Sequence, residues 1–266
     1  MSEKEVSTLW SKEWKNADYE FSIKKIENCL MNKKSYATYY ALADLGAKLN
    51  LEYGCCLDIG SGTGSYSLAL LKMKIVKRAY LIDSSISALR LAKKIFRYFG
   101  EDCELILGSA MALPFKEKTF EISLTSGLLE HFEDGDQEKI ISEQCEASID
   151  VFCQVPSDCN TYWVYQKVLA VFSGGWRFGV ERPLKTDKLE RLFAKSGFAI
   201  NATSYHDLFT AMFFLGSSKS KYFKPLKKKH FLNNLLKHEI IVHAVMKSTQ
   251  TNGITRKQSW VRNKSG

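Results

Sequence analysis

A short apolar segment that runs directly into three closely spaced glycines is the feature that most restricts how this chain can fold. It reads Cys-Cys-Leu-Asp-Ile-Gly-Ser-Gly-Thr-Gly over residues 55–64, and a helical pattern follows over residues 65–72. Glycine is needed where the backbone turns sharply, takes a positive φ or approaches a ligand without a Cβ in the way. The order of strand, glycine loop and helix therefore predicts a βα unit with a ligand site at the loop.

The rest of the chain alternates short apolar strands with helical patterns. Besides the first strand at 55–59, we expect strands at residues 79–83, 104–107, 121–125, 151–155, 199–204 and 240–246. In the clearest helix, between the second and third strands, Ser84 or Ser85 can cap the start and Gly100 can end it. This alternation predicts an α/β fold, a doubly wound, Rossmann-like sheet of seven mostly parallel strands with helices on both faces.

The length favours one such domain with additions. A chain of 266 residues, 45% hydrophobic and with only four prolines, can bury one full core but has little room for a second domain. We expect helical runs at residues 9–29 and 36–49. Within the second run, helix 41–49 and the tyrosines before it should close over a bound cofactor. The expected divisions are a helical N-terminal cap (1–50), the α/β domain (51–247) with substrate-side insertions (157–183 and 208–237), and a flexible basic tail (248–266).

The formal net charge of +9 is unevenly distributed. Residues 217–266 hold 12 of the 38 Lys and Arg residues but only one acid, Glu239, so this part carries +11 and the remainder −2. Seven lysines with interleaved aromatic residues fall in the Lys-rich segment, residues 219–237. Such a segment can bind nucleic acid or an anionic surface, or it can simply be a solvated insertion.

The cysteines and the lengths of the apolar runs indicate in which cellular compartment the protein is expected. The seven cysteines are odd in number and scattered, which fits reduced, mostly buried thiols rather than a disulfide framework. No run approaches about 18 consecutive apolar residues, and the first residues are charged. We therefore expect a cytoplasmic protein without a transmembrane segment.

A second carboxylate supports a ligand at the glycine loop. Asp83 ends the next expected strand, 25 residues after Asp58, where a carboxylate can accept hydrogen bonds from the hydroxyls of a ribose. A nicotinamide dinucleotide would need the spacing G-x-G-x-x-G, whereas this loop reads G-x-G-x-G. Asp58, directly before the loop, suits an ammonium group and would repel a phosphate. The pattern thus disfavours a dehydrogenase.

Later motifs extend the pattern along the chain. They are Leu-Ile-Asp-Ser at 81–84, Gly-Ser-Ala-Met-Ala-Leu-Pro-Phe at 108–115, Phe-Glu-Ile-Ser at 120–123 and Ser-Gly-Leu-Leu-Glu-His at 126–131. With the glycine loop, they make residues 50–155 resemble the class I S-adenosylmethionine-dependent methyltransferases. The resemblance implies S-adenosyl-L-methionine as cofactor, S-adenosyl-L-homocysteine as product and an antiparallel last strand.

The resemblance also implies roles for individual residues. The loop would pass under the methionine part, Asp58 would bind its ammonium group, and Asp83 would hold the ribose. Ser109 stands where the family commonly has Asp, so its bond to the adenine amino group would be weaker. Met111 would pack on the adenine, and Leu128 would line the methyl end. The implied cofactor-binding set is Asp58, Gly60, Ser61, Gly62, Thr63, Gly64, Asp83, Ser84, Ser109, Ala110, Met111, Ser126, Gly127 and Leu128.

Methyl transfer from a sulfonium needs few catalytic residues, because the protein mainly aligns a nucleophile and excludes water. His131 is the candidate general base, with a purely structural histidine as the alternative. Glu181 is the second candidate, and its alternative is an ion pair with Arg177 or Arg182. The five histidines are dispersed, so we expect no metal site. The predicted substrate-binding residues are Tyr36, Tyr40, Tyr162, Trp163, Trp176 and Arg177.

Three functions remain open on the sequence. The first is methyl transfer to an oxygen, nitrogen or carbon of a small-molecule acceptor. The second is methylation of RNA or protein recruited through the Lys-rich segment. The third is an inactive cofactor-binding partner subunit, which the intact Asp58, Asp83 and glycine loop disfavour. The sequence gives no indication of the oligomeric state.

Overall fold

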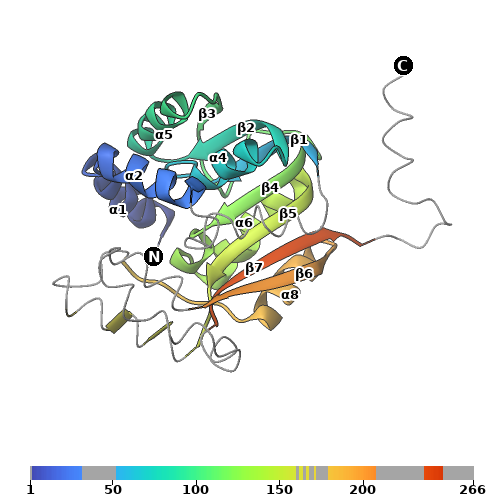
Figure 1. Ribbon diagram of the computed structural model, residues 1–266. Coiled ribbons are helices and arrows are strands. Elements are labelled where there is room, and N and C mark those ends of the chain that lie inside the picture. Colours follow the sequence, from blue (N-terminus) through green and yellow to red (C-terminus); the bar gives the residue numbers. More distant parts are fainter. Residues whose placement is uncertain are drawn as a thin grey trace, which may run out of the picture.

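The computed structural model describes residues 2–31, 52–159, 162–163, 166–167, 171, 179–207 and 237–247. Its centre is a seven-stranded sheet with the order β3-β2-β1-β4-β5-β7-β6 (Figure 1). The strands are β1 (Tyr53–Ile59), β2 (Val76–Asp83), β3 (Glu104–Leu107), β4 (Phe120–Ser126), β5 (Ser148–Pro156), β6 (Phe198–Asp207) and β7 (Lys237–Met246). Strands β1 to β5 pair in parallel, and β7 is antiparallel to both of its neighbours. The predicted α/β fold class and the antiparallel last strand are confirmed.

Seven helical elements surround this sheet within the described ranges. They are α1 (Glu3–Lys15), α2 (Tyr19–Met31), α4 (Ser65–Lys72), α5 (Ile86–Tyr98), the short 3-10 helix η1 (Leu129–His131), α6 (Asp134–Ala147) and α8 (Thr186–Lys195). Of the two predicted caps for α5, the structure uses Ser85, whose side chain accepts a hydrogen bond from the backbone N–H of Ala88. Helices α1 and α2 lie beside α5 (Figure 1).

The sheet order reverses between β1 and β4. From β1 the chain moves outward through β2 to β3, then returns to place β4 on the other side of β1. Right-handed crossovers consequently put α4 and α5 on one face and α6 on the other. Adjacent connections leave β1 and β4 in opposite directions, which opens a crevice at the carboxyl ends of these strands.

Apolar side chains fill both faces of the sheet. On one face, Leu68 of α4 and Phe96 of α5 pack in one buried cluster. On the other, Ile140 of α6 and Phe193 of α8 belong to a second cluster. Strand β1, at the centre, is buried over its last four residues, as expected for a strand covered on both faces.

The N-terminal helical run differs from the prediction. The single run expected over residues 9–29 is wrong in that two helices replace it, with a break at Asn16–Asp18. The side chain of Asp18 accepts a hydrogen bond from the backbone N–H of Phe21, which caps the start of α2 and competes with a continuous helix. The second expected run, 36–49, lies outside the described residues, and the division into cap, domain and tail stays a prediction.

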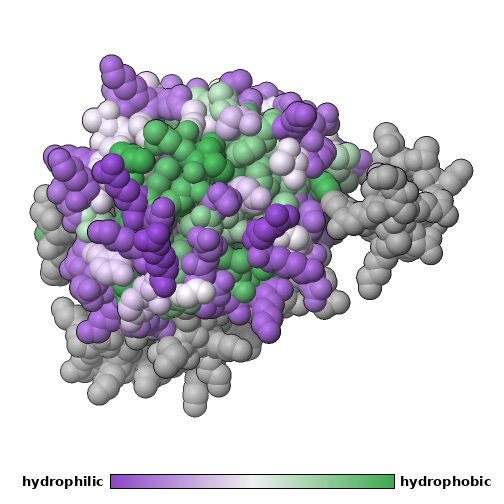
Figure 2. Space-filling view, turned by 90° about the horizontal axis from the view of Figure 1, so that it is seen from above, coloured by the Kyte–Doolittle hydropathy of each residue, from purple (hydrophilic) through white to green (hydrophobic). Residues whose placement is uncertain are grey.

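No helix within the described ranges is both long and apolar enough to cross a membrane. Seen from above the view of Figure 1, the molecule shows apolar residues gathered between hydrophilic ones (Figure 2). Strand β3 forms the edge of the sheet near this face and is only four residues long, with exposed Glu104 at its start. A short strand with a charged residue is a common protection against pairing between sheet edges.

Candidate functional site

A cavity of about 270 Å³ opens at the carboxyl ends of β1, β2 and β4, where the fold predicts a crevice. The loop after β1 forms its floor, and α1 covers it from the other side. Most of the predicted cofactor-binding residues line this cavity, namely Asp58, Gly60, Ser61, Gly62, Thr63, Asp83, Ser84, Ala110, Ser126, Gly127 and Leu128. Residues from three separate strand ends are thus brought to one place.

The glycine loop takes its shape from positive φ angles. Gly60, Gly62 and Gly64 have φ values of 65°, 53° and 66°, a region that side chains other than glycine rarely adopt. A Cβ on Gly64 would lie 2.3 Å from a side-chain carbon of Leu81, so this glycine allows close packing of α4 on β2. Gly64 therefore supports the loop from behind and is not among the residues that line the cavity.

Asp58 lies buried at the end of β1. Its carboxylate accepts a 2.7 Å hydrogen bond from the hydroxyl of Ser67. Burial raises the pKa of Asp58 to about 7, with a further contribution from the nearby charge of Asp83. A bound cation would favour the charged form of this carboxyl group, so the position suits an ammonium.

Asp83 ties the glycine loop to β2. Its two oxygens accept 2.8 Å hydrogen bonds from the backbone N–H groups of Gly62 and Ser85. Burial raises the pKa of this carboxyl group as well. Each carboxylate oxygen can accept a second hydrogen bond, so two neighbouring hydroxyl groups of a ligand can still be accommodated.

Two predicted cofactor residues, Ser109 and Met111, do not line the cavity. The hydroxyl of Ser109 donates a hydrogen bond to Glu3 of α1 and accepts one from the backbone N–H of Met111. Met111 packs, partly buried, against the cluster that contains Phe193. Contact of either side chain with an adenine ring remains a prediction.

Helix α1 supplies cavity residues that the sequence analysis missed. Trp10 and Trp14 lie on one face of α1, with ring centroids 5.7 Å apart and nearly parallel planes, and both line the cavity. A Cβ on Gly62 would lie 2.6 Å from the ring of Trp14, so the helix rests directly on the glycine loop. The spacing of the two tryptophans, four residues apart, was the available signal. The other missed lining residues are Glu3, Val6, Ser7, Ser65, Tyr66, Ile82, Gly108 and Phe132.

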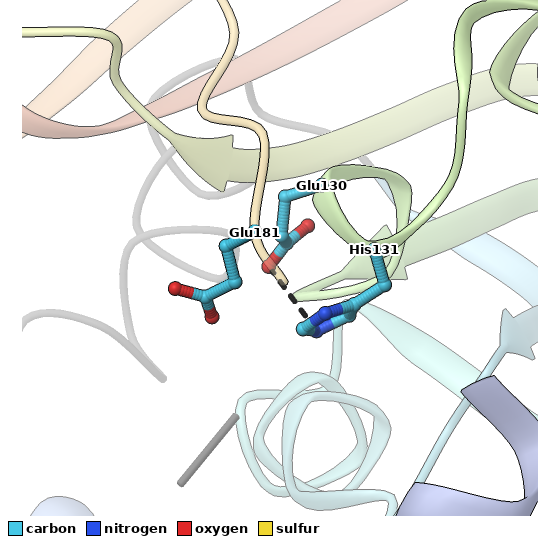
Figure 3. A group of neighbouring side chains, drawn as sticks. All are labelled: Glu130, His131 and Glu181. Carbon is cyan, nitrogen blue, oxygen red and sulfur yellow. Dashed lines mark ion pairs between the residues drawn. The ribbon is translucent and has the colours of Figure 1, made fainter. Parts of the chain in front are cut away.

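Both predicted catalytic residues, His131 and Glu181, lie close to Glu130 (Figure 3), and neither of them lines the cavity. One potential ligand atom from each of Glu130, His131 and Glu181 lies within 4.8 Å of the other two. We call these three residues the Glu-His-Glu cluster. Glu130 and His131 belong to η1, directly after β4, whereas Glu181 comes from the segment that precedes α8.

Burial dominates the electrostatics of this cluster. It lowers the pKa of His131 to about 4 and raises that of Glu130 well above its ordinary value. The ring of His131 meets the ring of Trp10 edge to face, with centroids 5.2 Å apart. The cluster therefore lies against the aromatic wall of the cavity, and its imidazole is neutral at physiological pH.

The predicted substrate-binding residues are only partly described. The hydroxyl of the buried Tyr162 donates a hydrogen bond to Glu181, and the Trp163 indole donates one to Asp158. Neither ring lines the cavity. Tyr36, Tyr40, Trp176 and Arg177 lie outside the described residues. Arg182, the described ion-pair candidate for Glu181, pairs with Glu133 at 3.2 Å.

Comparisons with known proteins agree with this arrangement. A family model described as a methyltransferase domain matches residues 56–147, which run from β1 to the end of α6. No curated protein matches the chain. The match and the fold confirm the resemblance to class I S-adenosylmethionine-dependent methyltransferases.

Solved structures share the fold at low sequence identity. A magnesium protoporphyrin IX methyltransferase from Synechocystis with bound S-adenosylhomocysteine is 15% identical, with a TM-score of 0.54 over 79% of this chain and 83% of that one. A putative methyltransferase from Bacillus halodurans is 16% identical, with a TM-score of 0.57 over 80% and 100% of the two chains. An S-adenosylmethionine-dependent methyltransferase from Clostridium acetobutylicum is 14% identical, with a TM-score of 0.57 over 87% and 100%.

Proposed function

We propose that this protein transfers a methyl group from S-adenosyl-L-methionine to a small-molecule acceptor and releases S-adenosyl-L-homocysteine. The observation that carries the proposal is the pair of buried carboxylates, Asp58 and Asp83, at the ends of neighbouring strands on either side of a glycine loop. Both line one cavity, and Asp83 keeps free acceptor capacity. One carboxylate for an ammonium and one for two hydroxyls match the two polar ends of this cofactor.

The lining residues give the cofactor a direction in the cavity. With its ribose on Asp83, its adenine would extend toward Ser84 and Ala110, and its ammonium group would reach Asp58. The methyl group would then face Gly127 and Leu128, at the end of β4. This orientation would place the reacting carbon on the side of the cavity nearest the Glu-His-Glu cluster.

Helix α1 supports a water-excluding role for the N-terminal region. The cavity volume of about 270 Å³ is slightly below the range of about 300–1,000 Å³ usual for small-molecule sites. Trp10 and Trp14 account for this tight enclosure, because they cover the loop directly. Displacement at a sulfonium carbon gains from such alignment and exclusion of water. A shift of α1 would admit the cofactor, and its return would close the site.

A hydroxyl or ammonium acceptor must also lose a proton. A neutral imidazole can accept that proton, although the pKa of about 4 makes His131 a weak base, and general base remains one of two proposed roles for it. The same nitrogen can instead coordinate a metal ion, but it cannot do both at once. The two roles make different predictions for metal binding and are separated below.

Two other functions have less support. Methylation of RNA or protein rests on the Lys-rich segment, residues 219–237, nearly all of which lies outside the described residues. An inactive cofactor-binding partner subunit would need the same two carboxylates, and nothing in the described residues favours it over an active enzyme. The free thiols of the described cysteines fit a reducing compartment, so we include a cytoplasmic location in the proposal.

Calorimetric titration of the purified chain with S-adenosylhomocysteine tests the proposal, with a nicotinamide dinucleotide as control ligand. We expect binding of the adenosyl compound alone, at one site and with micromolar affinity. Asp58→Asn should weaken it, whereas Asp134→Asn, a change of an exposed carboxylate, should leave it unchanged. Binding of the dinucleotide, or of neither ligand, would contradict the proposal.

A further inference from the structure

We propose that the Glu-His-Glu cluster binds a divalent transition-metal ion. Glu130, His131 and Glu181 each offer one ligand atom, and the three atoms lie within 4.8 Å of one another (Figure 3). A single ion placed between three such atoms can lie within about 2.8 Å of each. Bonds of about 2.0–2.2 Å, which zinc makes to imidazole and carboxylate, then require only small side-chain movements.

Unsatisfied polar atoms provide independent support. Oε2 of Glu130 and Nδ1 of His131 are buried and have no hydrogen-bond partner among the described residues. Each of the two residues is only 2% exposed. The carboxylate and the imidazole also do not satisfy each other, since Oε1 and Nε2 are 3.9 Å apart. Buried polar groups without partners are costly, and an ion bound to one oxygen of Glu130 and one ring nitrogen of His131 would compensate part of that cost.

The surrounding chain holds the three ligands in place. The positive φ of 65° at Gly127 turns the chain from β4 into η1. The backbone N–H of Arg182 donates a 2.7 Å hydrogen bond to the carbonyl of Glu130, which ties the segment carrying Glu181 to η1. The hydroxyl of Tyr162 donates a hydrogen bond to the carboxylate of Glu181. Outer partners of this kind orient metal ligands in known sites.

The donor set indicates the class of ion. One imidazole with two carboxylates suits zinc, manganese or ferrous iron. Magnesium favours oxygen ligands and keeps several waters, which this buried position does not favour. Glu181 is the most exposed of the three residues, so ion entry is easiest from its side.

The position of the cluster gives the ion a role that rests on the proposed function. A Cβ on Gly127 would lie 3.7 Å from Oε1 of Glu130, so the cluster directly adjoins the wall where the methyl group would face. An ion there could bind an acceptor oxygen in an open coordination position and lower its pKa. Metal binding itself requires no cofactor and can be measured without it.

The test is a zinc titration of the metal-depleted 266-residue chain against a competing chromophoric chelator. We expect one ion per chain with micromolar or tighter affinity. Glu130→Gln, Glu181→Gln and His131→Ala should each weaken binding at least tenfold, whereas Glu190→Gln, a matched change of an exposed carboxylate on α8, should not. Circular dichroism of each variant establishes that it is folded. Absence of stoichiometric binding, or wild-type affinity in the three folded variants, overturns the proposal.

Cobalt substitution distinguishes this site from binding by the free cysteines. We expect visible absorption bands of cobalt with nitrogen and oxygen ligands, without the near-ultraviolet charge-transfer band of a thiolate. Tyr162→Phe should weaken binding by up to about tenfold, because it removes only an outer partner. A thiolate band, retained in Glu130→Gln, would assign the ion to cysteine and overturn the proposal. Since both measurements omit S-adenosylmethionine, their failure is distinguishable from failure of the proposed function.

Discussion

Two groups of carboxylates lie at the same edge of the sheet, and the chain satisfies them to very different extents. Asp58 and Asp83 accept hydrogen bonds from Ser67, Gly62 and Ser85. The carboxylate of Glu130, in the cluster after β4, has an oxygen without a partner within the described part of the chain. The first group is already organised by hydrogen bonds from the chain, whereas burial of the second raises the pKa of Glu130, and the proposed cation would compensate that burial.

Replacement of Asp83 should have the largest effect, because it serves both the loop and the ligand. Asp83→Ala removes two hydrogen bonds to backbone N–H groups and the proposed contacts to two ribose hydroxyls. At about 1.5–3 kcal/mol for each hydrogen bond to a charged group, we expect affinity for S-adenosylhomocysteine to fall at least 100-fold. Calorimetric titration measures this change. Unchanged affinity of the Asp83→Ala variant would mean that Asp83 does not bind the ligand. The proposed difference between the Asp58 and Asp83 pair and the cluster that contains Glu130 would then be lost.

A smaller effect should come from the contact between the loop and α1. Gly62→Ala would place a Cβ 2.6 Å from the ring of Trp14 at a φ of +53°. We expect about 2 kcal/mol lower free energy of unfolding and roughly tenfold weaker cofactor binding, because α1 must move away. Gly100→Ala is the matched control, since its φ is +68° but no atom lies within 4 Å. It should show only the backbone cost of about 1–2 kcal/mol and normal binding.

The pH dependence of stability sharpens the comparison further. The pKa of Asp58 is raised to about 7 in the folded chain, above its ordinary value of 3.8. Between these values the folded state binds more protons than the unfolded state, so this group reduces the free energy of unfolding as pH rises from about 4 to 7. In the Asp58→Asn variant, the free energy of unfolding should therefore fall less steeply with rising pH than in the wild type. Denaturant titrations at a series of pH values between about 4 and 7 measure this slope. Identical slopes would contradict the burial effect.

The smallest effect is expected at Glu130 in metal-depleted protein. Glu130→Gln keeps the shape of the side chain and replaces a carboxyl group whose pKa is raised by burial and whose Oε2 has no hydrogen-bond partner among the described residues. We expect a change in the free energy of unfolding below about 1 kcal/mol, in either direction. Denaturant titration without metal measures it. A decrease of several kcal/mol in the free energy of unfolding would mean that the Glu130 carboxyl group already has strong partners in the metal-free protein.

The sheet and the glycine loop were predictable because their signals are local. A strand of about five residues, a glycine loop and a capped helix are each contained in a short window, and successive βα units fix the rest of the topology. The strand ends also predicted most residues that line the cavity, since parallel strands bring their carboxyl ends to one edge. Their roles in cofactor binding remain predictions.

What could not be predicted depends on contacts between distant segments. The bond between Glu3 and Ser109 joins residues 106 positions apart, so the sequence predicted a helical N-terminal cap but not which of its side chains line the cavity. Glu181 reaches Glu130 because a backbone hydrogen bond joins its segment to η1. The expectation of no metal site was based on dispersed histidines and stays a prediction, and the proposed cluster of one histidine and two carboxylates tests it.

The central claim is that the cavity holds S-adenosylmethionine between Asp58 and Asp83. The most direct test is a crystal structure of the full chain with S-adenosylhomocysteine. We predict both ribose hydroxyls within hydrogen-bond distance of the Asp83 carboxylate, the amino group beside Asp58, and the sulfur facing Gly127. Cofactor bound elsewhere, or an empty cavity at saturating ligand, would contradict the account.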